Sequence, residues 1–219
     1  EGSTQVKRMG KLGESHNQVL IDGKPQSATP VQEEIGDYTT EIRWKQHEEW
    51  VWSVGDATPF YEGGRVVRRA VVTHLDKLNP IVLIADVAFA DGGEHTFDWL
   101  LQTETGNTFE LCPNGAKLTG HRTGGTVRVT QVANVPVSWS QDEWISHPRL
   151  IGSSKGPCLI SLTMIGVDDT LVGEHGEGNI SLRHEDQEKG VLARVRWKEA
   201  GLAQSVEFDL ESEGLTFTI

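Results

Sequence analysis

An uninterrupted apolar run at residues 80–85, which ends at Asp86, constrains the fold of this chain more than any other segment. The run is too short for a buried helix but suits a strand that is covered on both faces. Around it, polar and apolar residues alternate with a period of two, and no segment carries its apolar residues at helical spacing. The sequence therefore predicts an all-β protein, a large antiparallel β-sandwich of many strands with little or no helix.

Strand-like segments follow one another along the chain and are separated by turns rich in glycine, asparagine and aspartate. No fixed repeat period is visible, which disfavours a propeller or a solenoid. Residues 140–156 are expected to form a long loop with one helical turn near residues 142–145. The expected strands are 16–21, 39–54, 65–75, 80–85, 94–102, 109–112, 116–119, 126–132, 135–139, 158–165, 179–184, 191–197, 205–210 and 215–219.

Length and charge limit the domain organisation and the partners. The 219 residues can bury the core of a single sandwich, so we expect one domain at residues 15–219 after a polar lead-in at residues 1–14. No apolar run approaches the roughly 20 residues of a membrane span, so no membrane partner is expected. The net charge of −12 would repel nucleic acid, which excludes that class of partner. The two cysteines, Cys112 and Cys158, argue against a disulfide framework and leave a single bridge open.

Two local patterns point to particular contacts. Residues 15–23, SHNQVLIDG, predict a short strand that begins with His16 and ends in a tight turn at Asp22 and Gly23. Arg68 and Arg69 are neighbours on an expected strand and must point to opposite faces. One of the two arginines is therefore expected to face a covered surface, where it needs an acidic or carbonyl partner, and Asp86 is the candidate.

The segments SHNQVLIDGKPQ, RRAVV and PIVLIADVAFADGGEHTFDWLLQT resemble, in order and rough spacing, the β-sandwich part of the heparinase II/III-like polysaccharide lyases. The resemblance covers roughly residues 15–102. It implies the C-terminal β-sandwich domain of an enzyme that cleaves uronic-acid-containing polysaccharides, such as alginate or heparan sulfate, by β-elimination. In that family the Tyr and His residues that act as base and acid lie mostly on an N-terminal α/α toroid, which this chain lacks. The isolated chain is therefore expected to be inactive, and its catalytic residues stay unassigned.

The same resemblance implies ligands and partners. His16 matches a zinc-binding histidine of the family, whose other ligands would precede residue 1, so zinc is expected in the full-length parent and not with certainty in this chain. An acidic polysaccharide and the N-terminal toroid are the expected partners. A negatively charged chain needs a local basic patch to bind such a polymer. We expect Asn17, Arg43, Lys45 and Arg68 to contact the polysaccharide. A periplasmic or secreted bacterial location is expected, with the cytoplasm as the alternative.

A non-catalytic carbohydrate-binding or structural β-sandwich is the alternative function. Its motivation is the set of tryptophans, which either fill the sandwich core or form a platform that stacks on sugar rings. The members of the set are Trp44, Trp50, Trp52 and Trp99. No GxSxG, HExxH, P-loop, CxxC or dinucleotide-binding motif is present, so hydrolase, zinc-protease and nucleotide-binding functions lack support. His175 and His184 lie beside carboxylates in turn-like segments, a pattern that we attribute to hairpin turns and not to a metal site.

Overall fold

The computed structural model describes residues 16–27, 43–47, 50–74, 80–90, 92–167, 180–184, 191–199, 202–209 and 215–218. Among these residues the strands pair antiparallel throughout, and the helical content is one short 3-10 turn, η2 (Thr58–Phe60). The prediction of an all-β sandwich is confirmed. No helix in these segments is long and apolar enough to cross a membrane.

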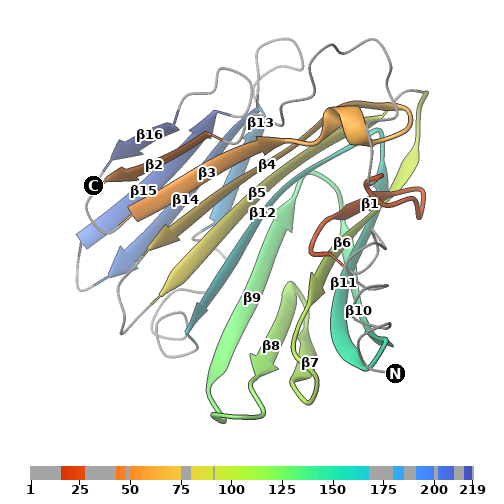
Figure 1. Ribbon diagram of the computed structural model, residues 1–219. Coiled ribbons are helices and arrows are strands. Elements are labelled where there is room, and N and C mark those ends of the chain that lie inside the picture. The colour runs from red at the N-terminus through yellow and green to blue at the C-terminus, as the bar shows by residue number, and fades with distance from the viewer. Residues whose placement is uncertain are drawn as a thin grey trace.

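The described strands form three sheets (Figure 1). The small sheet has the order β1 (Val19–Ile21), β6 (His95–Gln102), β11 (His147–Gly156) and β10 (Val137–Trp144). The large sheet has the order β2 (Arg43–His47), β3 (Trp50–Asp56), β4 (Gly64–His74), β5 (Ile81–Ala90), β12 (Cys158–Val167), β9 (Thr126–Ala133), β8 (Gly115–Thr119) and β7 (Thr108–Cys112). The third sheet has the order β13 (Ile180–His184), β14 (Val191–Glu199), β15 (Leu202–Asp209) and β16 (Leu215–Thr218).

The apolar run at residues 80–85 lies at the centre of the large sheet, where β5 pairs with β4 on one side and β12 on the other. Leu83 and Ala85 are fully buried on one face of this strand. Ala88, which points to the other face, is also fully buried and packs into the core between the large and small sheets. The predicted central strand, covered on both faces, is confirmed, and it continues past Asp86 to Ala90.

The core of the sandwich lies between the small and large sheets. Phe97 and Trp99 of β6 enter it from the small sheet, and Val67, Val129 and Leu159 enter it from the large sheet. The Trp99 indole is 1% exposed and meets the Trp139 indole edge to face, with 6.1 Å between ring centroids. Trp99 is therefore a core residue, and a sugar-stacking role for it is wrong. The side chains of Trp44, Trp50 and Trp52 lie outside the described residues.

Two predictions of local structure are wrong. Residues 140–156 form most of the hairpin β10–β11 and not a loop, with Ile145 and Ser146 at positive φ (48° and 65°) in its two-residue turn. The expected single strand at 39–54 is instead the pair β2 and β3, in which His47 is the register partner of Trp50. β10 is an edge strand, and its exposed polar residues resemble those of a loop. The error at 39–54 is of another kind, because the alternating pattern continues through the connection between β2 and β3. The lead-in at residues 1–14 and the turn that carries His175 lie outside the described residues.

Gly115, at the start of β8, provides a test of the pairing of β8 with β9. Its φ is +151°, and a Cβ atom there would lie 2.0 Å from the carbonyl oxygen of Val129. We expect Gly115→Ala to lower the free energy of unfolding by at least about 2 kcal/mol, because the paired backbone of β9 must move. Gly124→Ala is the control: its φ is +65°, but no atom lies within 4 Å of its added Cβ, so only the backbone strain of about 1 kcal/mol applies. Urea unfolding measures both, and equal losses would contradict the steric argument.

Candidate functional site

An ion pair inside the sandwich joins the two strands at the centre of the large sheet. Arg69 of β4 and Asp86 of β5 are register partners, and the guanidinium donates from Nε to Oδ1 at 2.6 Å and from Nη2 to Oδ2 at 3.1 Å. Arg68, the neighbour on β4, points to the opposite face and donates to Asp56 at 2.8 Å. The prediction that one of the two arginines would face inward and pair with Asp86 is confirmed.

The Asp86 carboxylate is held from three directions. It is 2% exposed and also accepts a hydrogen bond from Trp99 Nε1, at 3.0 Å, across the sandwich core. A buried carboxylate is tolerated only when it is paired and hydrogen-bonded, and these three donors supply both conditions. Burial, the largest influence on Arg69, would lower the pKa of its guanidinium, but the charge and hydrogen bonds of Asp86 outweigh it and raise the pKa. The Arg69 guanidinium is therefore charged at all ordinary pH values.

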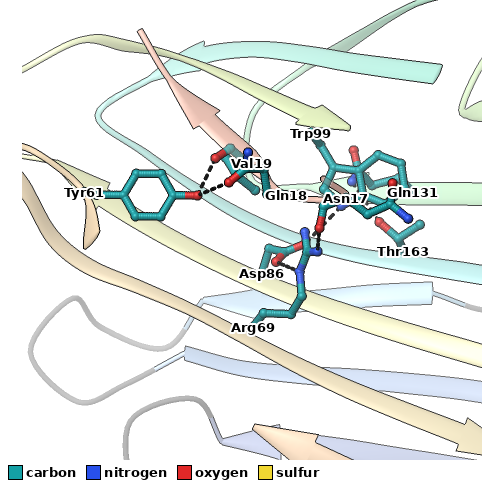
Figure 2. Close-up of polar contacts among 9 residues, drawn as sticks. All are labelled: Asn17, Gln18, Val19, Tyr61, Arg69, Asp86, Trp99, Gln131 and Thr163. Atoms are coloured by element: carbon teal, nitrogen blue, oxygen red, sulfur yellow. Dashed lines mark hydrogen bonds and ion pairs between the residues drawn. The ribbon is translucent and has the colours of Figure 1, made fainter. Parts of the chain in front are cut away.

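The same arginine fixes the segment that precedes β1 (Figure 2). Arg69 Nη1 donates to the backbone carbonyl of Asn17, and the Asn17 side chain accepts a hydrogen bond from the backbone N–H of Gln102 at 2.6 Å. Gln18, which is buried, accepts a hydrogen bond from the backbone N–H of Gln26 at 3.1 Å. Asn17, a predicted polysaccharide contact, thus lies at the junction of the two sheets, with its amide oxygen already engaged.

Tyr61 completes the junction. Its hydroxyl donates to the carbonyl oxygen of Val19 at 2.6 Å and lies 3.4 Å from Gln18 Oε1, and the residue is 3% exposed. Burial strongly raises the pKa of the Tyr61 phenol, and the nearby Arg69 charge offsets only part of that effect. The phenol is therefore a fixed hydrogen-bond donor and is unsuited to accept a proton from a substrate. Tyr38, the second tyrosine, lies outside the described residues.

The turn after β1 is also fixed by a side chain. Asp22 and Gly23 both have positive φ, 51° and 71°, which confirms the predicted tight turn. Asp22 accepts hydrogen bonds from His95, with 2.8 Å between Oδ2 and Nδ1, and from the Thr96 backbone N–H at 2.9 Å. The hydrogen bond from His95 is the main reason why the pKa of Asp22 is lowered. His95 lies partly exposed at the start of β6.

His16 is exposed and directly precedes this junction. No group of three or more His, Cys, Asp and Glu side chains in the described part of the chain is arranged to hold a metal ion. Zinc takes at least three protein ligands, so the described residues alone do not fit a zinc site around His16. Cys112 and Cys158 are both free thiols, which closes the question of a bridge between them. Burial raises the pKa of the Cys158 thiol, so this cysteine is a core residue and a poor thiolate ligand.

The predicted polysaccharide contacts do not form one cluster. Arg68 lies on the face of the large sheet opposite the ion pair, and it is bound to Asp56, with the two side chains 31% and 34% exposed. Asn17 lies on the other face, next to Arg69. Arg43 and Lys45 belong to the edge strand β2, and their side chains lie outside the described residues. The structure therefore separates Asn17 from Arg68 and does not decide the positions of the other two side chains.

Several residues of this site were not expected from the sequence. Tyr61 contacts Val19, Gln18 contacts Gln26, and Trp99 contacts Asp86. The sequence alone gives no sign of these three contacts. Polar residues at inward positions of strands are a weaker signal that was present: Ser161 and Thr163 alternate with apolar residues along β12, and both are fully buried. On β9, Gln131 faces Thr163 and donates to it from Nε2 to Oγ1 at 2.8 Å. These residues extend the polar part of the interior from the ion pair towards β9.

Comparison with known proteins gives a structural likeness and no sequence match. No family model matches the chain, and no curated protein is similar to it in sequence. Heparinase III is similar in structure, with a TM-score of 0.58 and 14% identity over 96% of this chain and 32% of that chain. A second heparinase III structure, with methylated lysines, gives a TM-score of 0.56 and 12% identity over 90% of this chain and 30% of that one. The chain therefore has a heparinase III-like β-sandwich fold and spans about a third of the length of heparinase III.

Asp86→Ala tests how much the ion pair between Arg69 and Asp86 contributes to the stability of the fold. We expect it to lower the free energy of unfolding by about 3–5 kcal/mol, because it leaves the Arg69 charge without its carboxylate partner and the buried Trp99 N–H without an acceptor. Glu62→Ala is the control, since Glu62 pairs with Lys24 at the surface with side chains 75% and 65% exposed, and its loss should stay within about 1 kcal/mol. Urea unfolding followed by tryptophan fluorescence measures both. A small loss for Asp86→Ala would show that the pair contributes little.

Asp56 gives a pH-dependent prediction. Burial is the largest influence and would raise its pKa, but hydrogen bonds from Thr58 and Arg68 outweigh it and the pKa is lowered. The ionised side chain therefore stabilises the fold above the unfolded pKa of about 3.9, and this stabilisation disappears as the pH falls through the folded pKa. We expect the difference in unfolding free energy between the parent chain and Asp56→Asn to be constant above about pH 5 and to shrink below about pH 4. A difference that stays constant through acid pH contradicts the assignment.

Proposed function

We propose that this chain is the β-sandwich domain of a heparinase II/III-like polysaccharide lyase that cleaves uronic-acid-containing polysaccharides by β-elimination. The observation that carries the proposal is the likeness to heparinase III, in which 96% of this chain corresponds to 32% of the larger one at a TM-score of 0.58. That proportion fits one domain of a longer enzyme. The proposal places the acid and base on an N-terminal α/α toroid of the same protein.

The location of the three sequence segments that resemble the family supports this proposal. The first segment lies more than 40 residues before the other two, yet the three supply Asn17, Arg69, Asp86 and Trp99, which are linked in one network. Residues that meet in space are more informative than three separate similarities, because a change in any one of them would leave a buried partner unsatisfied. The resemblance thus involves residues on which this fold depends.

The chemistry of the described residues favours a structural role for this domain and not a catalytic one. β-Elimination needs a group that neutralises the uronate carboxylate, a base that removes the C5 proton and an acid that protonates the leaving oxygen. Tyr61 is buried and donates to Val19, and Arg69 is occupied by Asp86. Neither is free for these tasks. We therefore assign no catalytic residue to this chain.

The proposal also includes contacts to the polysaccharide and to zinc. Asn17 and Arg68 already have protein partners, Gln102 and Asp56, so a polysaccharide would compete with existing hydrogen bonds at both. Arg43 and Lys45 on the edge strand β2 are the basic residues that we propose as the main contacts. His16 would supply a single zinc ligand in the longer protein, and the remaining ligands would have to come from outside the described residues.

The assay that tests the proposal compares this chain with the longer protein that contains it. Each is incubated with alginate and with heparan sulfate, and ultraviolet-absorbing unsaturated uronate products are followed. We expect products from the longer protein and none from the chain alone. Products from the chain alone would contradict the location of catalysis on the toroid, and no products from the longer protein would contradict the lyase assignment.

A binding measurement separates polysaccharide contact from catalysis. Arg43→Ala with Lys45→Ala should weaken retention of the chain on immobilised heparan sulfate, and the effect should fade as salt screens the charges. Lys155→Ala is the control, because Lys155 is an exposed cation on the small sheet that pairs with Glu94 at 2.8 Å. An equal loss for each charge removed, two in the double variant and one in the control, would show that retention depends only on overall charge.

A further inference from the structure

Two polar atoms on the inner face of the large sheet are buried without a partner. Ser161 is fully buried and Gln131 is 4% exposed. Neither Ser161 Oγ nor Gln131 Oε1 has a hydrogen-bond partner among the described residues. Buried polar atoms in folded proteins are almost always satisfied by protein or by an ordered water molecule, so both atoms call for an explanation.

The strand register brings these atoms into one part of the interior. Ser161 of β12 is the register partner of Asp86 of β5, so the two side chains lie next to each other on the same face. Gln131 of β9 is the register partner of Thr163, two residues along β12 and on the same face as Ser161. Ser161 is therefore flanked directly by Asp86 and diagonally by Gln131. Figure 2 shows Asp86, Gln131 and Thr163 together with the Trp99 indole.

The Gln131 amide is satisfied on one side only. Its Nε2 donates to Thr163 Oγ1 at 2.8 Å, and its Oε1 has no partner. Oε1 therefore needs a donor that the described protein groups do not provide.

Asp86 has capacity for one further donor. Its Oδ2 accepts from Arg69 and from Trp99, whereas its Oδ1 accepts from Arg69 alone. Each carboxylate oxygen can accept two hydrogen bonds, so Oδ1 can take another. A species that both donates and accepts is needed to serve Ser161, Gln131 and Asp86 together. A metal cation does not suit the position, because the Arg69 guanidinium is already bound to the same carboxylate.

We propose that one internal water molecule binds between Ser161, Gln131 and Asp86 as a fixed part of the sandwich. It donates one proton to Gln131 Oε1 and the other to Asp86 Oδ1, and it accepts the hydroxyl proton of Ser161. Water can donate two hydrogen bonds and accept others, and an internal water typically has two to four polar partners. The site continues the polar interior from Arg69 on β4, through Asp86 on β5 and Ser161 on β12, to Gln131 on β9. It is independent of the proposed lyase function.

The first test is a high-resolution crystal structure of the chain. We expect an electron-density peak within hydrogen-bonding distance of both Ser161 Oγ and Gln131 Oε1. A Ser161 hydroxyl that donates directly to Asp86 or to a backbone carbonyl, with no such peak, would overturn the proposal.

Magnetic relaxation dispersion of the water signal tests the site in solution, because it detects water molecules that stay inside a protein for long times. We expect Ser161→Ala to lose the contribution of one long-lived water. Ser154→Ala is the control: Ser154 is also buried, at 5% exposed, but its hydroxyl donates to the Phe97 carbonyl at 3.4 Å. If Ser161→Ala fails to fold, Gln131→Leu provides the same test from the other side. An unchanged signal in the folded variant would overturn the proposal.

Discussion

The interaction on which the rest of this structure depends is the burial of the Asp86 carboxylate. A charge in the interior is stable only with partners, and its partners come from different layers: Arg69 from the neighbouring strand of the large sheet and Trp99 from the small sheet. Asp86 therefore fixes the distance between the two sheets at this point. It also fixes the register of β4 against β5, because a shift by one residue would turn Arg69 to the opposite face. Through Arg69 the same carboxylate determines where Asn17, and hence β1, is held.

The part of this network that the sequence could predict is the part that depends on strand geometry alone. Adjacent residues on a strand must face opposite sides, so the Arg68 and Arg69 pair implied an inward arginine, and the apolar run before Asp86 implied a covered strand. The contact of Tyr61 with Val19 could not be predicted in this way, because 42 residues separate them and the two belong to different layers of the fold. Trp99 read as a core residue, but its partner Asp86 depends on how the sheets stack.

The loop predicted at residues 140–156 was wrong for a physical reason. β10 is an edge strand of the small sheet, and much of its sequence is exposed and polar, so it resembles a loop in composition. Its turn contains Ile145 and Ser146 at positive φ, where glycine or asparagine would have been the usual signal. The tertiary pairing with β11 outweighs both local signals. Strands at the centre of the large sheet, such as β5 and β12, carry the apolar pattern that pairing requires and were predicted close to their observed positions.

This chain and heparinase III are similar in fold although they are only 14% identical in sequence. The fold can be similar because an apolar core does not require particular residues. A sandwich core needs apolar side chains of suitable volume, and many sequences meet that need. A buried polar network is more demanding, since every member must keep its partner. In this chain Arg69 and Asp86 satisfy each other, and Tyr61 donates to Val19. These engaged side chains are consistent with the proposed location of proton transfer outside this chain, a proposal that itself rests on the likeness to heparinase III.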